Sequence, residues 1–380
     1  MPSRRNVLKQ LAAIGVLAGL GNLPGKAHAA SGNADEDATS ASGEQFHMPD
    51  EAAPQTQVWV AFAASADIWG RDYKEVQATI GRLVNAMTPY TKVSVLCREE
   101  EEALARKLCG EQNTRFIVAE LDDIWLRDTG GVFVQNGEGE LGLVDFNFNG
   151  WGDKQDHEQD AGVAELVSKQ ADAHYLQSKL TGEGGGIEVD GNGTGTGIMT
   201  ESCWLNSNRN PGVSKAQLEA ELKANLGLRK IIWLPGIKGK DITDAHVDFY
   251  ARFVRPGVVV VNLDNDPASH DYEVTRQHLA ILKQATDADG NKLELHVLPP
   301  PLDVRDNRFS RSRDFAAGYI NYLPINGAVI APEFGDKAAD RYCHDLLAKL
   351  YPGRKVVQIN IDPVAAGGGG IHCITLHQPA

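Results

Sequence analysis

Apolar and polar positions along this chain alternate between two periods. Short apolar runs such as residues 57–62 (QVWVAF) and 92–97 (KVSVLC) are typical of buried strands. Longer stretches such as 73–88 (YKEVQATIGRLVNAMT) place apolar residues on one face of a helix. The two kinds of segment follow one another to the end of the chain, which predicts an α/β protein.

The order of these segments repeats. Strand pairs are predicted at 131–135 and 141–148, around a turn at 190–195, at 247–254 and 257–263, and at 319–325 and 327–334. A helix and a further strand follow most of these pairs, for example 272–285 and 293–299. A doubly wound parallel sheet would have about one strand per helix, and this chain has more. We therefore expect five units of strand, strand, helix and strand, arranged as an α/β propeller around a central channel.

The first residues have the composition of an export signal. Arg4 and Arg5 precede an apolar stretch, and residues 27–29 (AHA) resemble a cleavage site. We predict a signal peptide at 1–29, a disordered lead-in at 30–45 and one catalytic domain at 46–380. The paired arginines favour the twin-arginine route, with an ordinary secretory signal as the alternative. Either signal predicts an exported protein, periplasmic or secreted.

Net charge and cysteine content limit the kinds of ligand and metal that the chain is expected to bind. Residues 1–29 contain four Lys or Arg and no acid, so the remaining chain has a formal charge of −18. This balance argues against nucleic acid and anionic membranes and mildly favours a cationic ligand. The five cysteines are an odd number without CxxC spacing, so at least one thiol is unpaired and no zinc motif is indicated. The sequence does not decide whether the chain forms a homo-oligomer.

Polar residues interrupt the apolar pattern in four glycine-rich or strand-end clusters. Taken singly, each has an ordinary structural interpretation, as a salt bridge, a turn acid, a core histidine or a buried thiol. Together they supply a nucleophile, a base and several carboxylates. The clusters are 121–131 with Asp122, Asp123, Trp125 and Asp128; 182–191 with Glu183; 241–253 with His246 and Asp248, which share a face if the segment is a strand; and 367–373 with Cys373.

This set of groups indicates a cationic electrophile. A cysteine, a histidine and one acid would suffice for acyl transfer, whereas additional carboxylates would repel the oxyanion that forms there. Carboxylates bind a planar guanidinium through paired, charge-assisted hydrogen bonds. A bound cation would also favour the thiolate form of the cysteine. The residues therefore predict hydrolysis at a guanidinium carbon.

Six motifs resemble those of agmatine deiminases, within the guanidine-modifying (pentein) group that includes bacterial peptidylarginine deiminases. The likeness runs from about residue 46 to the end and implies the five-bladed α/β propeller. One departure is Ala245, which stands where the family often has glycine. The motifs are DDIWLRDTGGVFV, EGGGIEVDGNGTG, ESCWLNSNRNPG, IIWLPG, TDAHVDFYARFVRPGVVV and GGGGIHCITLHQPA.

The resemblance implies a role for each matching residue. Cys373 would be the nucleophile and His246 the general acid and base, oriented by Glu183. Asp128 and Asp248 would clamp the guanidinium. Neither a metal nor an organic cofactor is implied, and His372 is expected to be structural. Three further residues complete the predicted site: Trp125 as a wall of the substrate pocket, and Asp122 or Asp244 for a polar substrate tail.

The implied reaction converts agmatine to N-carbamoylputrescine and ammonia through a covalent cysteine thiouronium. Three alternatives stay open at this point. A secreted arginine or peptidylarginine deiminase would need an arginine for the substrate carboxylate, which Arg305, Arg308, Arg311 or Arg313 could supply. A metal-dependent hydrolase could use His246, Asp248 and Asp128 as ligands. The last alternative is a non-catalytic protein that binds cationic ligands.

Overall fold

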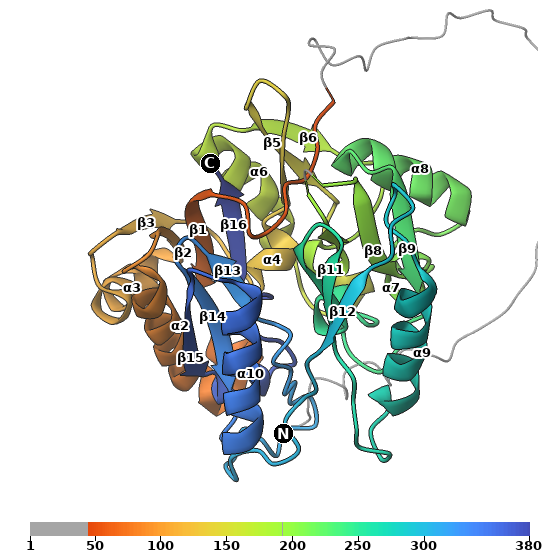
Figure 1. Ribbon diagram of the computed structural model, residues 1–380. Helices are drawn as coiled ribbons and strands as arrows, with labels where there is room; N and C mark the ends of the chain where they lie inside the picture. Colours follow the sequence, from red (N-terminus) through yellow and green to blue (C-terminus); the bar gives the residue numbers. More distant parts are fainter. Residues whose placement is uncertain (1–44, 192) are drawn as a thin grey trace, which may run out of the picture. The chain divides into compact units, whose positions relative to one another are not determined.

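Five small β-sheets and the helices that connect their strands make up the part of the chain that the structure describes (Figure 1). The structure is a computed structural model, and it describes residues 45–191 and 193–380. The predicted signal peptide, 1–29, and all but the last residue of the predicted lead-in, 30–45, lie outside the described residues. Glu44–Ala380 forms one compact unit.

Each sheet is one blade. The first has the order β16 (Thr375–Pro379), β1 (Gln55–Phe62), β2 (Lys92–Cys97) and β3 (Thr114–Val118). The second is β4 (Val132–Gln135), β5 (Leu141–Asp145) and β6 (His174–Gln177). The third is β7 (Glu188–Val189), β8 (Thr196–Thr200) and β9 (Lys230–Leu234). The fourth is β10 (Ala251–Arg255), β11 (Val258–Val261) and β12 (Glu294–Val297), and the fifth is β13 (Leu323–Ile325), β14 (Ala328–Glu333) and β15 (Lys355–Asn360).

One long helix links the second and third strands of each blade. In every blade the first two strands are antiparallel and the third is parallel to the second. A parallel pair needs such a crossover, because a tight turn can join only antiparallel neighbours. These helices are α2 (Tyr73–Met87), α6 (Val163–Ala171), α8 (Lys215–Leu226), α9 (Asp271–Gln284) and α10 (Lys337–Leu350), and α3 (Glu102–Cys109) adds β3 to the first blade.

Local sequence accounts for where these helices begin and end. Asp336 caps α10 by accepting the backbone N–H groups of Ala338 and Ala339. Ser214 and Gln217 form a capping box at the start of α8. Gly227 ends α8 in the left-handed conformation, with a φ of 67°, which glycine adopts at little cost.

The remaining helices are short, and several carry site residues. The α-helices among them are α1 (Ala66–Trp69), α4 (Leu126–Thr129), α5 (Gly150–Asp153), α7 (Glu201–Trp204) and α11 (Asp362–Ala365). The 3₁₀ turns are η2 (Gly70–Asp72), η3 (Glu99–Glu101), η4 (Asp160–Gly162), η5 (Gly184–Gly186) and η6 (Val247–Phe249).

The blades close into a ring. Strand β16 contacts β4, α4 contacts η5, and β7 contacts β10, which joins blades one to four in order. Arg252 of β10 donates to the backbone oxygen of Tyr322 beside β13 over 3.0 Å, which joins blade four to blade five. Gln55 of β1 donates to the backbone oxygen of Pro324 in β13 over 3.0 Å, which joins blade five to blade one. The C-terminal strand β16 pairs with β1, so the last strand of the chain completes the first blade (Figure 1). This pairing brings the residues just before β16 to the centre of the ring.

The predicted five units of strand, strand, helix and strand are confirmed. Two strands were not predicted: β6, an edge strand whose side chains are mostly exposed, and β16. The expectation that His246 and Asp248 share a strand face was wrong. The chain forms the 3₁₀ turn η6 there, and β10 begins only at Ala251. Short or edge elements of this kind depend on backbone pairing partners that local periodicity does not reveal.

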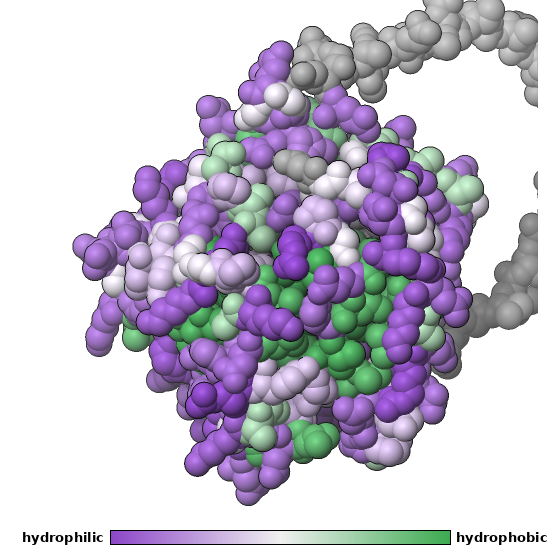
Figure 2. Space-filling model, viewed as in Figure 1, coloured by the Kyte–Doolittle hydropathy of each residue, from purple (hydrophilic) through white to green (hydrophobic). Residues whose placement is uncertain are grey.

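Apolar side chains fill the space between sheets and helices. The largest cluster includes Val60, Ile80, Val95 and Ile330. On the face shown in Figure 2, polar residues form the rim and an apolar area lies over β11 and β12. All five cysteines are buried and free of disulfides. Within residues 45–191 and 193–380, no helix has the length and hydropathy to cross a bilayer.

Candidate active site

The predicted site residues occupy equivalent places in different blades. Each lies within five residues of the first strand of its blade: Asp128 before β4, Glu183 before β7, His246 and Asp248 before β10, and Cys373 before β16. Because β16 contacts β4, α4 contacts η5 and β7 contacts β10, these turns meet at the centre of the ring. The structure thus brings the five predicted catalytic residues together.

Cys373 lies in the turn before β16 and is 7% exposed. Its sulfur is 3.5 Å from Asp248 Oδ2 and 3.4 Å from Asn321 Nδ2. Burial raises the pKa of the Cys373 thiol well above its usual value, and the charges of Asp248 and Asp128 raise it further. The resting residue is therefore a thiol at neutral pH, and a cation near the sulfur would favour the thiolate.

Three of the four glycines before Cys373 are needed for close packing. A Cβ on Gly369 would lie 2.2 Å from the Trp125 ring, and one on Gly367 would lie 2.2 Å from the Trp69 ring. A Cβ on Gly370 would lie 2.4 Å from Asn321 Oδ1. Any larger residue would push the turn away from these partners, so the glycine run sets the position of the nucleophile.

His246 is 2% exposed, and two carboxylates lie beside its ring. Nε2 donates to Glu183 Oε2 over 3.1 Å, and Nδ1 is 3.7 Å from Asp128 Oδ1. Burial acts to lower the pKa of His246, but the charge of Asp128 and the hydrogen bonds with Cys203 and Glu183 raise it well above its usual value. At neutral pH His246 is thus an imidazolium that can donate a proton.

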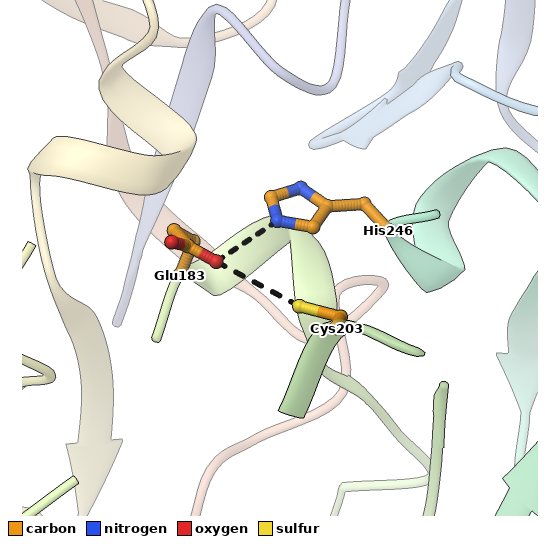
Figure 3. Close-up of side chains that lie close together, drawn as sticks. All are labelled: Glu183, Cys203 and His246. Atoms are coloured by element: carbon orange, nitrogen blue, oxygen red, sulfur yellow. Dashed lines mark hydrogen bonds and ion pairs between the residues drawn. The ribbon is translucent and has the colours of Figure 1, made fainter. Parts of the chain in front are cut away.

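Glu183 is held from three sides. Arg209 Nε donates to both carboxylate oxygens, over 2.8 and 2.9 Å, and the Cys203 sulfur lies 3.7 Å from Oε2 (Figure 3). Burial acts to raise the pKa of Glu183, but the charge of Arg209 and the hydrogen bond from His246 lower it. The residue therefore presents a fixed negative charge to the His246 ring, which agrees with the orienting role that the resemblance implies.

Asp128 also has fixed partners. Its Oδ2 accepts from Trp151 Nε1 over 2.9 Å, and its Oδ1 accepts from the Gly185 backbone over 3.0 Å. Burial raises its pKa, with the charges of Glu183 and Asp248 adding to the effect. A cationic ligand would relieve the repulsion among these acids.

A chain of hydrogen bonds runs from Asp248 to the segment before β1. His372 Nδ1 contacts Asp248 Oδ2 over 2.7 Å, and its Nε2 contacts Glu51 Oε1 over 2.6 Å. Burial acts to raise the pKa of Asp248, but the hydrogen bond from His372 lowers it. His372 thus keeps Asp248 ionised.

The three predicted substrate-binding residues are already engaged. Trp125 packs on the glycine turn and donates to Asp123 over 2.9 Å. Asp122 accepts the backbone N–H of Gln159 over 2.8 Å, at the start of η4. Asp244 pairs with Arg209 and Lys154 over 2.9 and 2.6 Å. Substrate binding by these residues stays a prediction, and the contacts of Asp122 and Asp244 indicate structural roles.

Several residues of the site were not predicted. They share one property: each is buried and contacts a residue of the site that lies 20 or more positions away along the chain. No local motif marks them, although Arg209 and Cys203 lie within the quoted ESCWLNSNRNPG stretch. They are Glu51, Trp151, Cys203, Arg209 and Asn321.

One group of side chains has the spacing of a metal site. Ligand atoms of Glu183, Cys203 and His246 lie within 4.8 Å of one another (Figure 3). The Arg209 guanidinium, however, is buried against both oxygens of Glu183 and would repel a divalent cation there. These residues fit an oriented acid–imidazole pair better than a metal centre.

The chain resembles one protein family along nearly all of the described length. Residues 47–379 match the model of the Porphyromonas-type peptidyl-arginine deiminases. The agmatine deiminase of Pseudomonas putida is 37% identical over 358 residues, covering 88% of this chain and 96% of the relative. The agmatine deiminase of Medicago truncatula is also 37% identical, over 366 residues, with the same coverage.

Solved structures agree with the sequence comparison. The agmatine deiminase of Enterococcus faecalis superposes with a TM-score of 0.82 at 31% identity, covering 88% of this chain and 96% of that one. A Campylobacter jejuni agmatine deiminase with substrate bound gives a TM-score of 0.78 at 25% identity, covering 90% and 98%. The predicted five-bladed α/β propeller is thereby confirmed.

Proposed function

Because the chain belongs to the Porphyromonas-type peptidyl-arginine deiminase family, we propose that it hydrolyses agmatine to N-carbamoylputrescine and ammonia. Its relatives in Pseudomonas putida and Medicago truncatula carry the name agmatine deiminase. The Campylobacter jejuni structure with substrate bound supports a small guanidine as the ligand of this site.

Two unpartnered polar atoms carry the proposal. Among the described residues, Asp248 Oδ1 and His246 Nδ1 are buried and have no hydrogen-bond partner. Native structures seldom leave buried polar atoms unsatisfied, and such atoms often mark a ligand site. A guanidinium is a planar array of N–H donors that matches a carboxylate. Its charge would also compensate Asp248 and Asp128, the two acids whose charges act on the sulfur.

The first half of the reaction uses the resting protonation states. Binding of the cation between Asp128 and Asp248 lowers the pKa of Cys373, and its thiol proton is released to solvent. The thiolate attacks the guanidinium carbon to give a tetrahedral adduct. The His246 imidazolium donates a proton to one amino group, ammonia leaves, and a positively charged S-alkylthiouronium remains on Cys373.

The second half reverses the role of the imidazole. Neutral His246 takes a proton from water, and the resulting hydroxide attacks the thiouronium carbon. Collapse of that adduct breaks the carbon–sulfur bond and releases the Cys373 thiolate, and the hydroxyl proton of the adduct passes to solvent as the carbonyl of the ureido product forms. The thiolate then takes up a proton from solvent, which restores the resting thiol. Proton transfer by a positioned group contributes about 10²–10⁴-fold, and Glu183 keeps the ring in position for both steps.

Replacement of the nucleophile tests the assignment. Cys373→Ala should release no ammonia from agmatine while a cationic guanidine still binds, as followed by a thermal shift. Cys343→Ala, a change to a buried thiol of α10, is the matched control and should leave turnover unchanged. Wild-type ammonia release by Cys373→Ala would refute the mechanism.

The substrate can be decided by comparison of three guanidines. Ureido product should form from agmatine in preference to free arginine and a blocked arginyl peptide. Three of the four candidate arginines for a substrate carboxylate already have acidic partners: Arg305 pairs with Asp362, Arg308 with Asp72, and Arg311 with Asp306. Faster turnover of the peptide would favour a peptidylarginine deiminase instead.

We further propose that the chain is exported through the twin-arginine route. Support comes from Arg4 and Arg5 ahead of the apolar stretch. Replacement of both by lysine should retain the full-length chain inside the cell, as followed by fractionation. Unchanged export of that variant would indicate an ordinary secretory signal.

A further inference from the structure

The turn before β13 is the one place in the ring to which sequence reasoning assigned no site residue. Blades one to four each contribute a predicted catalytic residue from the segment before their first strand. In blade five the equivalent position holds Asn321, two residues before β13 and fully buried. The ring geometry that brings Asp128, Glu183 and His246 to the centre brings Asn321 there too.

The contacts of Asn321 fix which way its amide points. Oδ1 accepts the backbone N–H of His372 over 2.9 Å and that of Cys373 over 3.3 Å. Only the oxygen of the amide can accept these hydrogens, so the nitrogen lies on the other side. That nitrogen is 3.4 Å from the Cys373 sulfur and donates to it.

A side-chain donor at this place acts against the burial and the two acids around the sulfur. Burial, Asp248 and Asp128 all disfavour negative charge on Cys373, whereas the hydrogen bonds from the Gly370 backbone and from the Asn321 side chain favour it. A fixed N–H donor stabilises a charge that develops during reaction without any reorganisation of the site. Negative charge develops on this sulfur before attack and again when the product leaves.

We propose that Asn321 is a catalytic residue that stabilises the Cys373 thiolate, both as nucleophile and as leaving group. Its oxygen holds the nucleophile turn while its nitrogen contacts the reacting atom. The part that concerns turnover rests on the proposed deiminase function. The part that concerns the sulfur does not, because thiolate formation can be followed with a reagent that is not a guanidine.

Two variants separate the oxygen from the nitrogen. Asn321→Asp keeps the acceptor for the turn and removes the amide donor. Asn321→Leu has a similar size, removes both and adds no charge, so it remains informative if the new acid takes up a proton. Asn326→Asp is the matched control, because Asn326 lies in the same blade as Asn321 but bonds the backbone N–H and C=O of Gln55 in blade one, away from the sulfur.

The experiment follows alkylation of the full chain by iodoacetamide across pH, with Cys373→Ala subtracted. We expect the midpoint of alkylation to rise by about one pH unit or more in both Asn321 variants, since nearby groups shift a pKa by about 1–3 units. The value of kcat for agmatine should fall by about 10²-fold, as when one oxyanion donor is lost. Asn326→Asp should match the wild type in both measurements.

Each outcome has one meaning. If both Asn321 variants are folded and alkylate with the wild-type midpoint, the residue only holds the turn and the proposal is overturned. If the midpoint rises while no guanidine is hydrolysed even by the wild type, the proposed function fails and the effect on the sulfur stands. Thermal melts should show a lower Tm for Asn321→Leu than for Asn321→Asp, because leucine leaves two buried N–H groups unpaired.

Discussion

Two buried histidines, each between two carboxylates, divide the site into unlike halves. His372 contacts Asp248 and Glu51 over 2.7 and 2.6 Å, so both of its nitrogens are occupied. His246 donates to Glu183 over 3.1 Å, while its Nδ1 has no hydrogen-bond partner among the described residues. A group that moves protons needs a nitrogen open to the substrate, and a group that holds a carboxylate does not. Both residues are histidines with a carboxylate bound to one ring nitrogen. Whether the other ring nitrogen also has a hydrogen-bond partner decides which of the two roles the residue can have.

The two histidines also differ in the charged groups that surround each ring. Glu51 forms ion pairs with Arg127 and Arg252 as well as with His372. The half of the site around His372 is therefore an ionic network in which each charged group has a partner. Such buried networks are costly to interrupt, because each partner removed leaves an uncompensated charge. In the half around His246, Arg209 pairs with Glu183, but the Nδ1 atom of the ring has no hydrogen-bond partner among the described residues.

The largest expected effect is a loss of turnover on replacement of His246, the histidine of the two with one ring nitrogen unpartnered within the described residues. His246→Asn should lower kcat for agmatine by about 10²–10⁴-fold, the usual contribution of a positioned acid or base. The control is His278→Asn, a buried histidine of α9 whose pKa burial alone lowers to about 4. A small effect at His246, equal to that at His278, would move the acid–base role to another residue.

Replacement of His372, whose two ring nitrogens both contact carboxylates, should weaken substrate binding and lower the stability of the protein together. In His372→Asn, Asp248 loses the donor that lowers its pKa, so KM for agmatine should rise by about tenfold, the equivalent of one pKa unit. The free energy of unfolding in urea should fall by about 3 kcal/mol, as when a buried pair loses one partner.

The matched control for this change is His296→Asn, whose ring contacts Glu294 on the edge strand β12. It should alter neither KM nor stability measurably. Loss of stability at His372 with an unchanged KM would show that the chain of hydrogen bonds supports the fold and not Asp248.

The two halves should also differ in how stability depends on pH. The folded pKa of His246 lies above its unfolded value, so the folded state binds more protons between the two values. The contribution of His246 is fully present below about pH 6.5 and is lost as pH rises through the folded pKa, by at most about 1.4 kcal/mol per pH unit. Urea unfolding of the wild type and His246→Gln at pH 6 to 9 would measure this. A difference between them that is constant with pH would contradict it.

The smallest expected effect is on stability, and it concerns the backbone turns just before Cys373 and His246. Gly368, before Cys373, has a φ of +97°, and Ala245, before His246, has a φ of +71°. Alanine is disfavoured in the left-handed region by roughly 1–2 kcal/mol, whereas glycine is not. Ala245→Gly should therefore stabilise the protein by about 1 kcal/mol in urea unfolding, because the relief of strain exceeds the added flexibility of the unfolded chain.

Gly368→Ala is the converse variant and should destabilise by a similar amount. A loss of stability in Ala245→Gly would mean that contacts of the Ala245 methyl, which is buried, outweigh its backbone strain.

Much of the fold was accessible from the sequence because the helices and central strands have strong periodicity. The motifs of Asp128, Glu183, His246 and Cys373 were recognised because each is a polar interruption of an apolar pattern. Strand β6 was missed because its side chains are mostly exposed. Asn321 was missed because an asparagine before a strand is ordinary in any sequence. The equivalence of the five blades would have pointed to it.

The sequence by itself determined the repeated units, the chemical groups of the site and the glycines that let the nucleophile turn approach two indoles and an amide. Tertiary structure alone decided which histidine keeps a ring nitrogen without a hydrogen-bond partner, which carboxylates are fixed by ion pairs and which side-chain amide donates to the sulfur. Glu51 and His372 are 321 positions apart, and they meet only because β16 closes the ring against β1. Periodicity in the sequence indicates which face of each segment is buried. Hydrogen bonds across the ring depend instead on how all five blades are positioned relative to one another.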